Sequence, residues 1–288
     1  MQAFFFGLGF SSINAAEALR QHGFDRISGT VRSPEKAAHL QARDIEAVVF
    51  DGTTPGAEVS RTLARSSHLV FSIAPGEDGD PVLRHHRNDL DAAPALQWLC
   101  YYSTVGVYGD FGGDWIDETA PLVPRNMRSD WRVLAEQAWR DYAAERGLPL
   151  CILRLAGIYG PGRSTFDKLR AGTARRIIKP GQVFNRIHVA DIARVTALAA
   201  ERRLAGTFNL ADDEPAPPQD VIAYAAGMIG MDIPPDMPFE TAEMTPMQRS
   251  FYRDNKRVSN RSIKRALGIE MLYPNYRMGL TQILESEK

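Results

Sequence analysis

Three observations predict an α/β fold with a doubly wound parallel sheet. Apolar, strand-like runs alternate with helical stretches through the first half of the chain, as in a parallel sheet covered by helices. The first run ends in closely spaced glycines, which is typical of a buried strand that turns directly into a helix. Prolines then stop the sheet pattern at residues 212–218, before a helix predicted at 220–229.

The individual elements follow from local patterns. Phe4, Phe5 and Phe6 have no polar alternation, which indicates a strand covered on both faces, and residues 13–21 carry helix-forming side chains. Further strands are predicted at Arg26–Val31, 45–50, 68–73, 98–103 and 149–155, and later helices at 189–200 and 220–229. Ligands of such sheets bind beyond the carboxyl ends of the strands, so candidate site residues are sought there.

Composition limits the classes of function. The chain has 288 residues and a net charge of -1, so it offers no electrostatic footprint for nucleic acid. We expect a protein of the cytoplasm without a membrane partner, because no apolar run approaches the roughly 18 residues of a membrane span and no signal peptide is recognisable. Cys100 and Cys151 lie in apolar runs and are expected to be buried free thiols, and no metal site is predicted. A small-molecule substrate is expected, and a homodimer is left open.

The first glycines form the pattern Gly7-x-Gly9-x-x-Ser12 between strand and helix. Gly7 would make the tight turn, and Gly9 would let the backbone approach a pyrophosphate at the positive end of the helix. Phe10, Ser11 and Ser12 would then lie against a bound dinucleotide. Ser12 replaces the third glycine of the usual pattern, and an ordinary glycine turn explains the same residues.

Residues after the second, third and fourth strands extend this prediction. Arg32 stands where an acidic residue would bind the ribose 2′-hydroxyl, so the predicted cofactor is NADP, with Ser33 as a second donor. In the alternative, Arg32 is a solvated charge and Ser33 caps the helix that Pro34 begins. Asp51 would accept from the adenine amino group, and the cofactor would be lined by Ile73, Ala74 and Pro75.

Five motifs in order carry a resemblance to a known family. They are S-T-V-G-V-Y-G at 103–109, L-R-L-A-G-I-Y-G-P-G-R at 153–163, R-I-H-V-A-D at 186–191, G-T-F-N-L-A-D-D-E at 206–214 and K-R-V-S-N at 256–260. The chain resembles the extended short-chain dehydrogenase/reductase family, also called the NAD-dependent epimerase/dehydratase family. The resemblance covers nearly the whole chain and implies a Rossmann-like sheet with a C-terminal substrate lobe.

The resemblance also implies roles for individual residues. Thr104 would hydrogen-bond the substrate oxygen at the carbon where hydride is removed or added, and Ser103 would lie beside the nicotinamide. Ala156 and Ile158 would complete the cofactor site. The substrate would be contacted by Thr104, Arg128, Gly157, Tyr159, Arg163 and Arg186.

The family's Tyr-x-x-x-Lys motif is replaced here by Arg128-Ser-Asp-Trp-Arg132. The two arginines share a helix face, but a guanidinium with a pKa above about 12 gives up no proton at neutral pH. Arg132 could bind ribose hydroxyls, and Arg128 could stabilise a developing oxyanion. Two exposed helix arginines are the alternative interpretation. Tyr108 and Tyr159 are the candidate replacement acids, although each also has a packing role in its turn.

The expected domains are a dinucleotide-binding domain at residues 1–158, completed by about 183–212, and a substrate lobe at 159–182 and 213–288. Seven basic residues at 163–186 suit a phosphorylated or nucleotide-linked substrate, and a solvated basic face explains them equally well. The predicted function is an NADP-dependent oxidoreductase or epimerase-like enzyme acting on a small carbonyl or sugar substrate. The alternative is a non-catalytic NADP-binding sensor or regulatory protein.

Overall fold

The computed structural model describes residues 1–287 and divides into two compact units, which are taken separately below. Unit 1 comprises residues 1–104, 127–154 and 192–208, and unit 2 comprises 105–126, 155–191 and the chain from 209 onward. These boundaries differ from the expected ones, because residues 105–126, 155–158, 183–191 and 209–212 were expected in the dinucleotide-binding domain and lie in unit 2.

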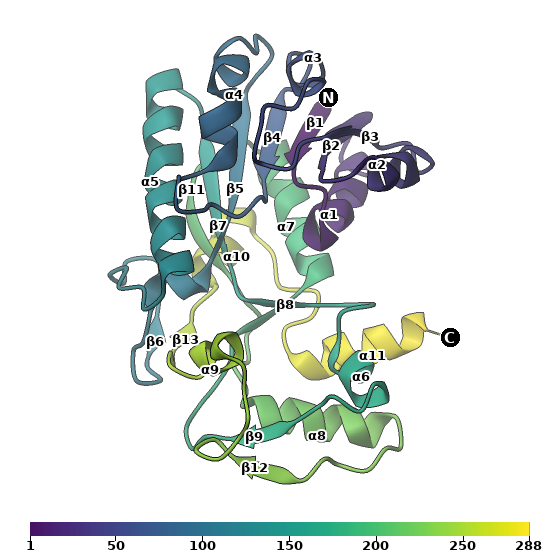
Figure 1. The fold of residues 1–288 in the computed structure, drawn as a ribbon, viewed down its shortest axis with the longest axis vertical. Coiled ribbons are helices and arrows are strands. Elements are labelled where there is room, and N and C mark those ends of the chain that lie inside the picture. The colour runs from purple at the N-terminus through teal and green to yellow at the C-terminus, as the bar shows by residue number, and fades with distance from the viewer. Residues whose placement is uncertain (288) are drawn as a thin grey trace. The chain divides into compact units, whose positions relative to one another are not determined.

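A seven-stranded sheet forms the centre of unit 1 and confirms the doubly wound prediction (Figure 1). The strand order is β11-β7-β5-β4-β1-β2-β3, and the pairs β1–β2, β2–β3, β1–β4 and β4–β5 are parallel. The strands are β1 (Gln2–Phe6), β2 (Arg26–Val31), β3 (Glu46–Val49), β4 (His68–Phe71), β5 (Trp98–Thr104), β7 (Leu150–Leu155) and β11 (Gly206–Leu210). Chain order reverses beside β1, and such switch points are where ligands bind in these folds.

Side chains alternate between the two faces of this sheet, and helices cover both. Tyr101 points to helix α5 (Met127–Arg146), where it contacts Arg132 and Trp139, whereas the hydroxyl of the next residue, Tyr102, lies 2.7 Å from Thr196 of helix α7 (Val189–Glu201). Phe4 and Phe6 of β1 join a fully buried cluster with Trp139. Because both faces are buried, these strands read as continuous apolar runs.

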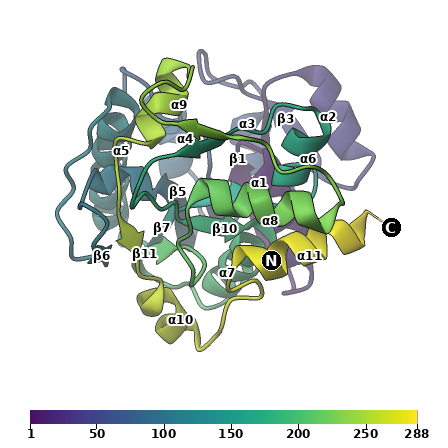
Figure 2. The same cartoon turned by 90° about the horizontal axis from the view of Figure 1, so that it is seen from below.

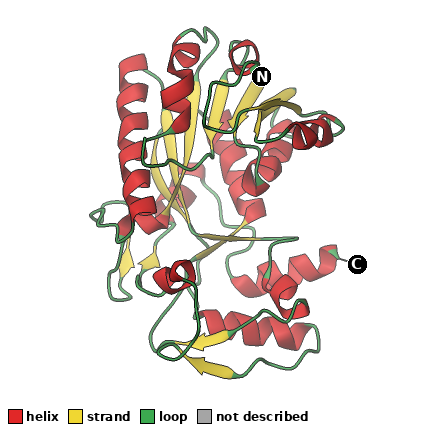
Figure 3. Ribbon diagram, viewed as in Figure 1, coloured by secondary structure: helices red, strands yellow, loops and turns green. Residues whose placement is uncertain are grey.

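Along the chain, the helices of unit 1 connect one strand to the next; Figure 3 draws these helices in red beside the yellow strands of the sheet. They are α1 (Phe10–Arg20), α2 (Pro34–Gln41), α3 (Val59–Leu63), α4 (Pro81–Asp91), α5 (Met127–Arg146) and, extending from unit 2 into unit 1, α7 (Val189–Glu201). Helix α1 begins at Phe10, earlier than the predicted 13, because the backbone enters the helix directly after Gly9. Helix α4 is capped by Asp80, whose carboxylate accepts the backbone N–H groups of Val82 and Leu83.

Unit 2 contains short strand pairs and helices. Its strands are β6 (Trp115–Ile116), β8 (Gly157–Tyr159), β9 (Arg176–Ile178), β10 (Arg186–His188), β12 (Asp236–Pro238) and β13 (Arg257–Val258), after a 3-10 turn, η1, at Val105–Tyr108. Its helices are α6 (Thr165–Arg170), α8 (Pro218–Met228), α9 (Pro246–Phe251), α10 (Arg261–Leu267) and α11 (Tyr276–Ser286). Figure 2 shows α8 beside α11, where the Tyr224 and Tyr276 rings meet edge to face. Within residues 1–287, no helix is both long and apolar enough to cross a bilayer.

Candidate functional site

The turn between β1 and α1 is held by side chains from two neighbouring strands. The N–H of Gly7 donates to Thr30 Oγ1 of β2 at 2.8 Å, and the Gly7 carbonyl accepts from Ser72 Oγ at 3.2 Å. Gly7 has φ +97°, and a Cβ there would meet Ile73 Cγ1 at 3.1 Å. This position therefore requires glycine for both its conformation and its space.

Gly9 differs from Gly7 in both respects. Its φ is −93°, which any residue adopts, and a Cβ added to it would meet no protein atom within 4 Å. Open space in front of Gly9 fits the predicted reason for this glycine, which is close approach of a ligand to the backbone. The first turn of α1 carries no acidic residue and no side-chain cap, so its positive end is left for an anion.

Ser11 and Ser12 lie in that first turn of α1. Both are buried, and the Ser12 hydroxyl has no hydrogen-bond partner among residues 1–287. The close contact between helix and sheet therefore tolerates the hydroxymethyl group in place of a third glycine. Phe10, the first helical residue, is half-buried.

Arg32 and Ser33, which follow β2, have different environments. Ser33 caps α2, accepting the backbone N–H of Lys36 at 3.4 Å, and its hydroxyl also helps to hold the pKa of Glu35 below its usual value, after the larger effect of a backbone hydrogen bond. The capping alternative is thus correct for Ser33. Arg32 is exposed and makes no ion pair or hydrogen bond with any residue in 1–287, so its five donors are available to a ligand.

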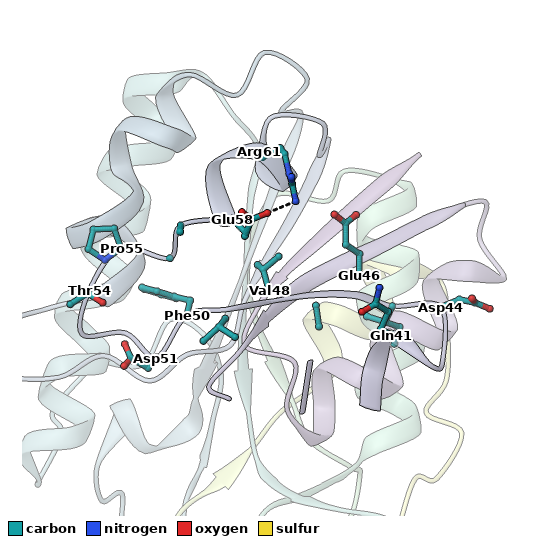
Figure 4. A pocket seen from close by; sticks show the side chains of 15 residues that line it. Gln41, Asp44, Glu46, Val48, Phe50, Asp51, Thr54, Pro55, Glu58 and Arg61 are labelled. Atoms are coloured by element: carbon teal, nitrogen blue, oxygen red, sulfur yellow. Dashed lines mark ion pairs between the residues drawn. The ribbon is translucent and has the colours of Figure 1, made fainter. Parts of the chain in front are cut away.

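The loops after β3 and β4 complete the edge of the sheet in unit 1. Asp51 is exposed, and its Oδ1 accepts from the Thr53 N–H at 2.8 Å and the Thr53 hydroxyl at 2.7 Å, bonds that lower its pKa. Ile73 lies against Gly7, whereas Ala74 is exposed and Pro75 is buried. A cavity of about 820 Å³ runs along the edge strand β3 and reaches Phe50 and Asp51 (Figure 4).

At the end of β5, Ser103 is occupied by a buried polar network. Its hydroxyl donates to Glu136 Oε1 at 2.6 Å, and Glu136 also pairs with Arg154 at 2.8 Å and Arg140 at 2.9 Å. Burial acts to raise the pKa of Glu136, but the bonds and charge of Arg154 outweigh it, so this pKa is lowered. With this bond formed, the Ser103 hydroxyl could meet a nicotinamide only as an acceptor. Thr104, the last residue of β5, is half-buried.

The two arginines that replace the Tyr and Lys of the family motif have different environments on α5. Arg132 donates to the Tyr102 carbonyl at 2.8 Å and to the Tyr101 hydroxyl at 3.2 Å, with its guanidinium 5.5 Å from the centre of the Tyr101 ring. It is therefore fixed against β5 rather than solvated. Arg128, one turn earlier, is exposed. The alternative of two exposed arginines is wrong for Arg132.

The candidate replacement acids lie in unit 2 and are both confined by packing. Tyr108 is fully buried and its hydroxyl donates to Asn209 Oδ1 at 2.7 Å. Tyr159 packs edge to face on His188, and its hydroxyl contacts the backbone position of Gly279 in α11, where a Cβ would collide with it. Burial raises the Tyr159 pKa well above its usual value. Neither hydroxyl is placed to give a proton to a substrate, so we do not retain Tyr108 as catalytic.

The family of the chain is shown by a family model: the model described as the NAD dependent epimerase/dehydratase family matches residues 7–211. The chain belongs to this family. The matched range begins at the glycine turn and ends with β11, so it contains the whole set of strand ends described above, and the resemblance expected from the motifs is confirmed.

Individual proteins that this chain is similar to are less informative about activity. A functionally unknown conserved protein from Silicibacter pomeroyi is 46% identical over 99% of this chain and 98% of its own, with a TM-score of 0.89. A putative NAD-dependent epimerase/dehydratase from Methylobacillus flagellatus is 25% identical over 99% and 98%, with a TM-score of 0.74. A 3-diazoavenalumate denitrifying reductase from a Streptomyces species is 27% identical over 180 residues; the match spans 57% of this chain and 58% of that relative.

In unit 2, the pairing of β8 with β10 brings several predicted substrate residues together. Gly157 pairs with Arg186, and Tyr159 pairs with His188, while Ala156 is tied to Leu210 of β11 by a 3.0 Å backbone bond. Ile158 is half-buried opposite Ile187, and Arg163 pairs with Gly160 through an isolated bridge. The buried carboxyl of Asp212, which follows β11, has a pKa raised by burial.

Most cations of the basic stretch at 163–186 have partners inside unit 2. Five of the seven bind backbone carbonyls or acidic side chains: Arg170 binds Glu287, Arg175 the Glu243 carbonyl, Arg176 Asp236, Lys179 the Tyr252 carbonyl, and Arg186 the carbonyls of Phe184 and Ala216. A bond to a carbonyl leaves the positive charge in place, so of these five only Arg170 and Arg176 are neutralised, by the carboxylates that they pair with.

Sequence reasoning missed the residues that hold the site residues in place. Thr30 and Ser72 fix the glycine turn, and Glu136 with Arg154 fixes α5 against β5 and β7. A usable signal existed for one of them: Arg154 is a charged residue inside the apolar run C-I-L-R-L, and buried charges require a partner. That partner lies on another element and could not be named from local sequence.

Proposed function

We propose that this chain is an NADP-dependent oxidoreductase that acts on a small carbonyl substrate. The observation that carries the proposal is Arg32, an exposed guanidinium at the end of β2 with no ion pair or hydrogen bond within residues 1–287, at the place where the fold family binds the ribose of the dinucleotide. A 2′-phosphate would supply the bidentate anionic partner that the guanidinium lacks. NAD has only a hydroxyl at this place.

The residues of unit 1 fit the rest of such a cofactor. Gly7 and Gly9 would admit the pyrophosphate at the start of α1, and Asp51 would face the adenine, whereas the Ser12 hydroxyl is buried. When bound, the nicotinamide would supply or accept a hydride. Thr104 would hydrogen-bond the substrate oxygen, and the exposed Arg128 would direct a fixed positive charge at the same oxygen as negative charge develops.

The proposed class of substrate rests on how the cations of unit 2 are held. Arg170 and Arg176 are paired with carboxylates, and three further cations of the basic stretch donate to backbone carbonyls, so these donors are already engaged and would have to be released to bind a diphosphate, which weighs against a nucleotide-linked substrate. The similarity to a denitrifying reductase supports reduction as the reaction type. We therefore favour a small, uncharged carbonyl compound over a nucleotide sugar.

A second candidate is a protein that binds NADP without turnover. It is favoured by the proton-transfer positions: arginines replace the Tyr and Lys of the family motif, and the hydroxyls of Tyr108 and Tyr159 are packed inside unit 2. Cofactor binding would then serve sensing or regulation. Both candidates share the cofactor and differ in whether a proton can be delivered.

The test begins with a screen of aldehydes, ketones and nucleotide sugars for NADPH oxidation by the purified protein. With a substrate in hand, we expect Arg128→Ala to lower kcat by about 10²–10³, as for loss of an oxyanion donor, and Arg128→Lys to lower it less. Unchanged kcat in Arg128→Ala would remove Arg128 from the mechanism. If the native protein is inactive and Arg128→Tyr turns over, the non-catalytic candidate is correct, because only a proton donor was missing.

A further inference from the structure

The loop that follows β3 rests on helix α4 at two glycines. This loop, residues 51–58, begins with Asp51 and ends at α3. Gly52, at φ +89°, lies over Pro81, where a Cβ would come within 3.5 Å, and its carbonyl accepts from Arg84 at 3.4 Å. Gly56 lies against Val49, Phe50 and Val59, with no room for a side chain. The path of the loop is therefore set by α4 and the end of β3.

One side chain of α4 reaches the loop backbone at Gly56. The Gly56 N–H donates to His86 Nε2 at 3.2 Å, and His86 Nδ1 lies 2.8 Å from Asp89 Oδ2. Because Nε2 accepts, it carries no proton, and the ring donates from Nδ1 to Asp89. The other oxygen of Asp89 accepts from the Ser60 hydroxyl of α3 at 2.6 Å. A continuous chain of hydrogen bonds thus joins the loop, α4 and α3.

The placement of His86 deforms the helix that carries it. His86 has φ −127° and ψ 15°, outside helical values in the middle of α4, and its side chain is only 1% exposed. The ring packs edge to face on Phe50 at 4.7 Å between centroids. A backbone conformation outside helical values is unfavourable in the middle of a helix, so the surrounding contacts must hold it in place. Residues held in this way are common at functional sites.

From this geometry we propose that His86 is a positioning residue for the adenosine half of the cofactor. It acts through Gly56 on the loop that presents Asp51, and it touches no part of the cofactor itself. The inference rests on the proposed function, because it needs the dinucleotide to be bound at the strand ends of unit 1. It assigns a role to His86, a buried side chain of α4.

The experiment measures how two amide substitutions at His86 change the affinity for each half of the cofactor. In His86→Asn the short amide keeps the bond to Asp89 but cannot reach Gly56, whereas in His86→Gln the longer amide oxygen can accept at the place of Nε2. Affinities are measured by calorimetry for NADPH, for 2′,5′-ADP as the adenosine half, and for reduced nicotinamide mononucleotide as the other half. Circular dichroism confirms folding, and His85→Asn is the matched control one residue away.

We expect His86→Asn to weaken NADPH and 2′,5′-ADP about tenfold, because the Gly56 donor loses its partner, and to leave the nicotinamide half unchanged. His86→Gln and His85→Asn should bind all three probes like the native protein. A general structural role would weaken both halves alike, and that result, or native affinity of His86→Asn for 2′,5′-ADP, would overturn the proposal.

Two further outcomes keep the test decisive. If His86→Asn does not fold, Asp89→Ala leaves His86 in place but removes what orients its ring, and it should weaken 2′,5′-ADP selectively; equal weakening of both halves would again overturn the proposal. If the native protein binds neither NADPH nor 2′,5′-ADP, the proposed function itself fails and this inference falls with it. If native binding is normal and only the selectivity is absent, the proposed function survives alone.

Discussion

The arginines of this chain illustrate how environment assigns a role to a side chain. Arg132 donates to the Tyr102 carbonyl and the Tyr101 hydroxyl, so its guanidinium connects α5 to β5. Arg32 has the same chemistry at the end of β2 but no partner in residues 1–287. A planar fork that is held by the protein cannot reorient to a ligand without breaking those bonds, whereas an exposed one can. The proposed choice of NADP over NAD therefore rests on Arg32.

The first prediction concerns this choice. Arg32→Ala should reduce the preference for NADPH over NADH by about tenfold or more, since a charge-assisted bond contributes on the order of 1.5–3 kcal/mol. Calorimetric titration of both cofactors measures it. Arg26→Ala is the matched control, because Arg26 is also exposed and unpartnered but lies at the opposite end of β2. Equal affinity of the native protein for the two cofactors would contradict the prediction.

Helix α5 is positioned by charge as well as by its apolar face. Trp139, Tyr142 and Ala135 pack into the core cluster of unit 1, and Glu136 on the same helix pairs with Arg154 of β7 and Ser103 of β5. Glu136 and Arg154 are at most 3% exposed, so the charge of each is compensated by the other rather than by water. Removing one partner of such a pair leaves a buried charge without compensation.

The second prediction tests this dependence. Glu136→Gln should cost about 3–5 kcal/mol of unfolding free energy, and the double variant Glu136→Gln/Arg154→Met should recover part of the loss. Urea denaturation at pH 7 measures both. Because the folded-state pKa of Glu136 is lowered, its contribution is fully present above pH 4.5, the unfolded value, and is lost as the pH falls through the folded value. A double variant less stable than Glu136→Gln would show that the pair is not the cause.

The whole molecule has two compact units, with the predicted cofactor residues up to Arg132 in unit 1 and the last two, Ala156 and Ile158, in unit 2. A cofactor that binds the folded chain but not the unfolded chain stabilises the folded state by mass action. A rise in thermal stability when the cofactor is added therefore shows that its site is intact. The two glycines of the β1–α1 turn allow the site and the fold to be separated, because one needs its conformation and the other only the space before it.

The third prediction uses that difference. NADPH at 100 times its Kd should stabilise the native protein by about 2.7 kcal/mol. Gly9→Val should fold normally and show no such shift, because its side chain would enter the open space where the pyrophosphate is expected. Gly7→Val should melt at a lower temperature without any ligand, because of its positive φ and the contact with Ile73. Thermal melts with and without NADPH measure all three, and a native-like shift in Gly9→Val would place the cofactor elsewhere.

The sequence by itself determined the doubly wound sheet, the family and most strand positions, because these follow from apolar runs, glycine spacing and motif order along the chain. β2 was predicted with its exact bounds, and β3 and β4 within two residues. The tertiary structure alone decided which polar residues are engaged: that Ser103 is bound to Glu136, that Tyr108 and Tyr159 are enclosed, and that Arg170 and Arg176 of the basic stretch are paired with carboxylates. The physical reason is that a side chain's charge and donors are readable from its identity, whereas the partner that neutralises or buries them lies on an element distant in sequence.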